Sequence, residues 1–189
     1  MNHLTHPLSP SFDLENIDSA NFPDSLSSFI FSLDATFVIK PSKIVFTPGK
    51  TEVCLVRLLE SFGHNGGGMS VGVARPDIPE HGESLHQSHG WSLNTAGFLT
   101  YSGAPQYLRG KEYGPRKEDG CYVRDGDVIG LVMDMVKGEL SFIVNGENLG
   151  VAFSGIPTDE PLIPCVICLE GFKCSVDFIS WDDLNNKKI

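Results

Sequence analysis

Between Asp125 and Phe153, hydrophobic and polar positions are spaced as in β-strands joined by tight turns. Residues 128–133 are apolar on both faces, which is typical of a strand in the middle of a packed sheet. Apolar and polar positions alternate over residues 139–144, as expected for the next strand. Asn145-Gly146 then predicts a type I′ hairpin turn, because both central residues of that turn need a positive φ. The alternation continues to Phe153, so we expect three antiparallel strands here.

The rest of the chain carries further short β-prone runs, separated by glycine, proline, serine and aspartate. No segment has the periodicity of a strongly amphipathic helix. About a dozen short strands without such a helix indicate an all-β sandwich. The runs cover residues 29–31, 36–39, 44–46, 51–59, 70–74, 91–93, 97–101, 165–169 and 174–179.

The length of 189 residues suits one sizeable domain. We expect residues 1–25 to form an N-terminal extension that is partly ordered or draped on the domain. Residues 26–181 should form the domain, and residues 182–189 a polar C-terminal tail. No apolar run reaches the roughly 18 residues of a membrane span, and no signal peptide is recognisable. We therefore expect a cytoplasmic protein, with the nucleus as the alternative.

The charge of the chain restricts its partners. Lysine and arginine number 14 against 24 aspartates and glutamates, a formal net charge of −10. A surface this acidic repels phosphate backbones and anionic lipids. The sequence therefore predicts no binding to nucleic acid and none to membranes.

The cysteines and histidines are not arranged as metal ligands. The five cysteines, an odd number, favour reduced thiols. Cys165 and Cys168 are three positions apart in a predicted strand, which places them on opposite faces. His81, His86 and His89 match none of the helix or hairpin spacings that pre-position ligands. We expect no metal site and no cofactor.

The sequence also predicts no catalytic residues. The glycine-rich segment 63–68 precedes a strand, whereas a phosphate-binding loop needs a helix N-terminus after it. Asp127 and Asp134 flank one strand seven positions apart, which favours turn and strand-end roles over acid/base chemistry. There is no G-x-S-x-G nucleophile elbow. We expect Trp91 to anchor the core.

The order of the motifs resembles the SPRY domain signature over roughly residues 30–180. The resemblance implies a concanavalin-like fold, a bent sandwich of two antiparallel sheets. It also implies protein recognition through loops at one edge, as in TRIM proteins and SPRY/SOCS-box ubiquitin-ligase adaptors, and no catalytic site. The motifs are Trp91-Ser92-Leu93, Gly126–Leu131, Met133-Asp134 with Gly138–Phe142, Asn145-Gly146 through Phe153, and Leu162-Ile163-Pro164.

In the SPRY/SOCS-box group, a loop before the tryptophan and the turn after the "L-x-P" strand line the peptide pocket. These places correspond here to residues 83–89 and 169–172. The aromatic residue of that first loop has no clear counterpart, and Glu170 adds a negative charge to the turn. The location of the pocket is therefore expected to carry over, while its peptide specificity is not. The candidate partner-binding residues are Leu85, His86, His89, Tyr101, Leu169, Glu170, Gly171 and Phe172.

Phe172 is the most suggestive of these residues, since an exposed aromatic beside a charge is the composition of a binding hot spot. We expect a monomeric, non-catalytic module that binds a short peptide segment of a partner protein, with a basic or neutral peptide favoured by charge. The alternative is a lectin-like, carbohydrate-binding sandwich, which would need aromatic platforms and usually calcium-binding loops. The chain is either a stand-alone module or a fragment of a larger protein.

Overall fold

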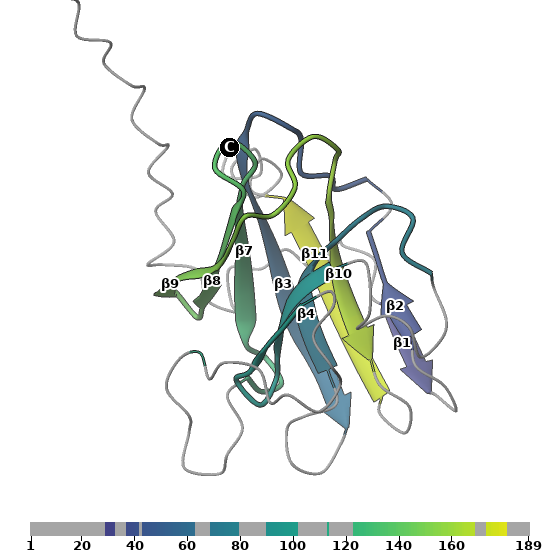
Figure 1. Cartoon of the computed structure of the whole chain (residues 1–189). Helices are drawn as coiled ribbons and strands as arrows, with labels where there is room; N and C mark the ends of the chain where they lie inside the picture. Colours follow the sequence, from purple (N-terminus) through teal and green to yellow (C-terminus); the bar gives the residue numbers. More distant parts are fainter. Residues whose placement is uncertain are drawn as a thin grey trace, which may run out of the picture.

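A computed structural model of the chain describes residues 29–32, 37–41, 43–62, 69–79, 90–101, 113, 123–168 and 173–180. These residues form eleven β-strands and no helix. The strands lie in two antiparallel sheets, one behind the other in Figure 1. The predicted all-β class and two-sheet antiparallel sandwich are thus confirmed.

The larger sheet has six strands in the order β1-β11-β3-β7-β8-β9. Every neighbouring pair is antiparallel, and a bulge between Ser175 and Val176 interrupts the pairing of β11 with β3. The strands are β1 (Phe29–Ser32), β3 (Thr51–Phe62), β7 (Val128–Asp134), β8 (Glu139–Val144), β9 (Glu147–Ser154) and β11 (Lys173–Ser180).

The smaller sheet has five strands in the order β2-β10-β4-β5-β6. Because β10 lies between β2 and β4, the sheet joins segments from the beginning and the end of the described chain (Figure 1). Its strands are β2 (Phe37–Ile39), β4 (Met69–Ala74), β5 (Gly90–Asn94), β6 (Leu99–Tyr101) and β10 (Ile163–Cys168).

The predicted three-strand meander is β7, β8 and β9. Strand β7 is largely buried along its whole length, as its unbroken apolar run indicated. Asn145 and Gly146 have φ angles of 49° and 85°, the two positive values that a type I′ turn needs. This two-residue turn sets the register of β8 against β9, with Val144 paired to Glu147 next to the turn.

The main core fills the space between the two sheets. On β3, the side chains of Cys54, Val56 and Leu58 point into this core, while Val53, Leu55 and Arg57 occupy the other face, as alternation along a strand requires. Burial of these apolar side chains is the main favourable contribution to folding. The opposing sheets also supply Val71, Val73, Leu93, Val166, Ile129, Leu131, Phe142, Val176 and Phe178.

Two predicted strands are shorter than expected. Of residues 44–46, only Phe46 pairs, in an isolated bridge to Leu162, because a turn at residues 47–50 immediately redirects the chain into β3. The strand expected over 97–101 begins at Leu99, because residues 94–98 close a turn in which Gly97 has a φ of 87°. Residues 1–25 and 182–189 lie outside the described residues.

Candidate protein-binding site

The eight candidate binding residues fall almost entirely outside the part of the chain that the structure describes. Of these residues, the structure describes only the backbone of Tyr101. This residue is the last of β6 and lies directly opposite Trp91 of β5. The seven others, outside the described residues, are Leu85, His86, His89, Leu169, Glu170, Gly171 and Phe172. The described strands form the framework from which these segments leave.

The two predicted segments are attached to opposite ends of β10 and its neighbour β4. The turn 169–172 follows Cys168, which pairs with Met69 at the beginning of β4. The connection 80–89 leads to Gly90, which pairs with Ala74, the last residue of β4 and the partner of Ile163. The two attachment points are separated by the length of a six-residue strand, about 17 Å.

The outer face of the five-stranded sheet, which is turned away from the six-stranded sheet, lies between these attachment points. Along β10 this face carries Ile163, Cys165 and Ile167, which form a buried cluster with Val38 and Ala74. Ile78, four residues beyond the end of β4, belongs to the same cluster. Its carbonyl oxygen accepts a hydrogen bond of 3.1 Å from Lys40 Nζ. The segment that begins connection 80–89 is thus fixed on this face.

Beside this cluster the outer face becomes polar. Gly72 lies between Cys165 and Ser92, and the Ser92 and Thr100 hydroxyl groups are hydrogen-bonded at 2.6 Å. A Cβ at Gly72 would come within 2.7 Å of Ser92 and closer still to the carbonyl oxygen of Trp91, so only glycine fits. The outer face therefore combines an apolar half along β10 with a hydroxyl-bearing half along β5 and β6.

The buried cysteines are poor nucleophiles. Burial raises the pKa of the Cys165 thiol to about 12, although the nearby Lys40 charge opposes this. Burial also raises the pKa of the Cys54 thiol. Cys165 lies in the outer-face cluster and Cys168 in the main core, so the prediction that they occupy opposite faces is confirmed. The described residues contain no group of three or more potential metal ligands.

The two aspartates that flank β7 stabilise turns, as predicted. Asp127 accepts hydrogen bonds from the backbone N–H of Arg124 at 2.7 Å and from Asn145 Nδ2 at 2.7 Å. Asp134 accepts two from the backbone N–H groups of Val136 and Lys137. Trp91 packs against the main core, which confirms its predicted anchoring role.

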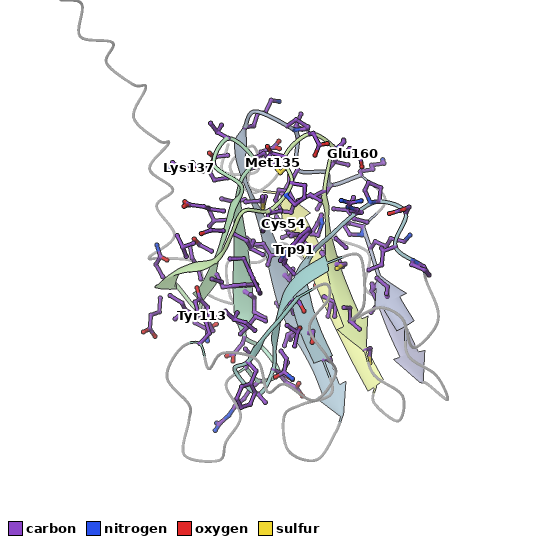
Figure 2. The ribbon with its side chains drawn as sticks, in the orientation of Figure 1. Cys54, Trp91, Tyr113, Met135, Lys137 and Glu160 are labelled. Atoms are coloured by element: carbon purple, nitrogen blue, oxygen red, sulfur yellow. The ribbon has the colours of Figure 1, made fainter. Side chains whose placement is uncertain are left out.

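Tyr113 is a buried residue that sequence reasoning did not single out. It comes from the long connection between β6 and β7 and lies beside β8 and β9 (Figure 2). Its backbone N–H donates to Gly97 at 2.9 Å, and its ring meets Phe142 edge-on with centroids 5.9 Å apart. Its hydroxyl group donates to Gly150. One residue thus links the β5–β6 turn to the six-stranded sheet, and no periodic pattern around it signals this.

In its described residues, the protein is an antiparallel two-sheet β-sandwich without helices. Among the described residues there is no helix that could span a membrane. The SPRY domain model matches residues 56–180, so the chain belongs to the SPRY domain family. This fold is that of a protein-interaction module.

Solved structures agree with this assignment. The crystal structure of the SPRY domain of human HERC1 superimposes with a TM-score of 0.62 and 20% sequence identity, covering 84% of this chain and 91% of that chain. A crystal structure of another human SPRY domain gives a TM-score of 0.58 and 18% identity, covering 82% and 88% of the two chains. At these identities the likeness concerns the fold alone. No curated protein matches the chain.

Proposed function

We propose that this SPRY domain is a non-catalytic module that binds a short, extended segment of a partner protein between connection 80–89 and turn 169–172. The observation that carries the proposal is the framework of β10 and β4, from whose opposite ends these two segments leave. A ligand segment held there would gain affinity from a few buried anchors and from main-chain hydrogen bonds.

The framework favours binding because it is rigid on both sides. Strand β10 is buried over its whole length and paired on both edges, so its last residue, Cys168, is held in place. On the other side, Ile78 and the Lys40 hydrogen bond fix the start of the connection. A framework that is fixed before binding loses less conformational entropy when the ligand arrives.

The charge of the chain favours one kind of ligand. With a formal net charge of −10, the domain attracts basic or neutral peptides over acidic ones. Glu170 in the turn adds to this preference. Raising the ionic strength should therefore slow association more than it speeds dissociation.

The setting of the module is part of the same proposal. The three cysteines whose side chains are described are free thiols, which supports a reducing compartment, the cytoplasm or the nucleus. We propose that the domain is monomeric and recruits its partner as an adaptor does, within a ubiquitin-ligase or signalling protein. Light scattering of the purified domain tests the monomer.

A peptide-display selection tests the binding function. Peptides selected against the parent domain should bind Leu85→Ala and Phe172→Ala variants at least tenfold more weakly, about 1.4 kcal/mol, because each change removes one anchor. Val136→Ala is the matched control, since Val136 is 67% exposed in the turn between β7 and β8 of the other sheet. Its binding should equal that of the parent domain.

Two results would contradict the proposal. If neither Leu85→Ala nor Phe172→Ala weakens the selected peptides, the binding site lies elsewhere. Calcium-dependent binding on a glycan array, without any peptide selected, would favour the carbohydrate-binding alternative instead.

A further inference from the structure

The outer face of the six-stranded sheet, which is turned away from the five-stranded sheet, is buried. Ile179, Leu55 and Ile143 form a row across β11, β3, β7 and β8, with Gly130 between the last two. Their exposed fractions are 0%, 1% and 6%, and Val53 in the next row is 4% exposed. A free sheet face would leave these side chains in water, so other residues must cover them.

The described segments between the strands do not supply this cover. Their hydrogen bonds join Phe46 to Leu162, Lys50 to Met135 and Leu58 to Gly126, all at the ends of the sandwich. Ile78 lies on the five-stranded sheet. The buried residues of the outer row belong to neither of the two core clusters described above.

The same face contains a shielded ion pair. Arg57 and Asp177 are neighbours on β3 and β11, with Arg57 Nη2 2.8 Å from Asp177 Oδ2 and side chains 15% and 4% exposed. A carboxylate this well buried beside an apolar row shows that the cover extends beyond Leu55 toward the other end of the sheet.

We propose that the C-terminal segment 181–189 is the cover, and that Trp181 is its anchor. Side chains at positions 175, 177 and 179 of β11 belong to the outer face, so continued alternation places position 181 on that face too. Ser180 pairs with Cys54, and the same register puts Trp181 opposite Val53. This explains the burial of Val53 at the end of β3 where the sheet would otherwise be open.

The row at Gly130 lies within reach of Trp181. With no side chain of its own, Gly130 lets Leu55 and Ile143 lie close together, since an added Cβ would be only 3.5 and 3.3 Å from them. This row is about 7 Å from that of Val53, a distance that an indole ring can bridge. Across β11, β3, β7 and β8 the row spans about 14 Å, and nine residues reach about 30 Å when extended. Leu184 and Ile189 are the further apolar residues of the segment.

This inference goes beyond the proposed function because it assigns an occupant to the outer face of the six-stranded sheet, which the proposed peptide site does not use. The outer face of the six-stranded sheet would be occupied by the chain itself and closed to partner proteins. Loss of the C-terminal segment would expose a strip of aliphatic side chains, which is a liability for aggregation.

Tryptophan fluorescence tests the proposal, because Trp91 and Trp181 are the two tryptophans of the chain. In a Trp91→Phe variant, the emission of Trp181 should be blue-shifted, resist acrylamide quenching, and shift to the red only when urea unfolds the protein. Emission typical of a solvent-exposed tryptophan in the folded variant would overturn the proposal. If the variant does not fold, the difference spectrum between the parent and Trp181→Phe gives the same information.

Truncation shows which end of the chain covers the outer face of the six-stranded sheet. Removal of residues 181–189 should lower the urea midpoint and increase binding of a hydrophobic dye, and Trp181→Ser should give much of both effects. Asn185→Ser is the matched control in the same segment and should change neither. If removal of residues 1–25 produces both effects while removal of 181–189 produces neither, the N-terminal extension is the cover and the proposal is wrong.

Discussion

Tyr113 and Gly150 are joined by a hydrogen bond of 2.5 Å, in which the tyrosine hydroxyl donates to the glycine carbonyl oxygen. The bond lies where β8 and β9 lose their regular pairing: Phe142 alone stands opposite two residues of β9, Leu149 and Gly150. Gly150 has a φ of 80°, the left-handed conformation that such a bulge often needs. The same hydroxyl accepts a bond of 3.4 Å from the backbone N–H of Phe142. Tyr113 therefore replaces ladder bonds that the bulge breaks.

Tyr113→Phe should lower the free energy of unfolding by about 1–3 kcal/mol, because it leaves a buried N–H and a carbonyl without their partner. The ring and its contact with Phe142 would remain. Urea denaturation measures the loss. Tyr113→Leu should cost more, since it also removes the aromatic contact. Equal stability of the parent protein and Tyr113→Phe would show that the hydroxyl group contributes nothing to the bulge.

The ionisation of Tyr113 should make the fold sensitive to alkali. Burial raises the pKa of the Tyr113 hydroxyl to about 12 from an ordinary value of 10.0, against a smaller opposing effect of the Phe142 N–H. Because the pKa is higher in the folded state, the neutral form stabilises folding. This contribution is complete below pH 10 and is lost as the pH rises through 12.

A spectrophotometric titration checks this prediction. The difference in phenolate absorbance between the parent protein and Tyr113→Phe isolates one group, whose midpoint should be near pH 12 in the folded protein and near pH 10 in denaturant. A midpoint near 10 in both states would mean that the hydroxyl group is solvated.

Gly138 should tolerate substitution less well than other glycines with the same backbone conformation. It has a φ of 68° in the turn between β7 and β8, and a Cβ there would lie 2.5 Å from the carbonyl oxygen of Ile156. Gly49 has a φ of 79° with nothing within 4 Å of its Cβ position. Gly49→Ala should cost about 1 kcal/mol for the left-handed conformation alone. Gly138→Ala should cost at least about 2 kcal/mol, because the backbone must also shift. Equal losses in thermal unfolding would show that the turn moves freely.

The parts of the fold that were predictable are those that local chemistry determines. Asn145-Gly146 needs no distant partner to form its turn, and the alternation along Thr51–Leu58 assigns the two faces of β3 by period alone. Residues 44–46 show the limit of this reasoning. They have strand propensity, but only Phe46 finds a partner, in Leu162 more than 100 residues away. Strand formation depends on such neighbours as much as on propensity.

The candidate site was less predictable because it depends on sheet order. The motifs located two segments, but that these attach to opposite ends of β10 follows from the pairing of β10 with β4. Nothing local to either segment reveals that pairing. Tyr113 was missed for the same reason, since Phe142 and Gly150 are 29 and 37 residues away from it.

The Arg57–Asp177 pair should be strongly coupled. Asp177→Asn should lower the free energy of unfolding by about 3 kcal/mol, because it removes the negative charge that lies 2.8 Å from a largely buried guanidinium. Combining it with Arg57→Met should cost less than the sum of the two single changes, and a double-mutant cycle measures this coupling. Lys137→Ala is the control: Lys137 is 59% exposed and 3.5 Å from Asp134, so its loss should cost less than about 1 kcal/mol. A coupling between Arg57 and Asp177 no larger than that of the exposed pair would mean that water reaches the outer face of the six-stranded sheet.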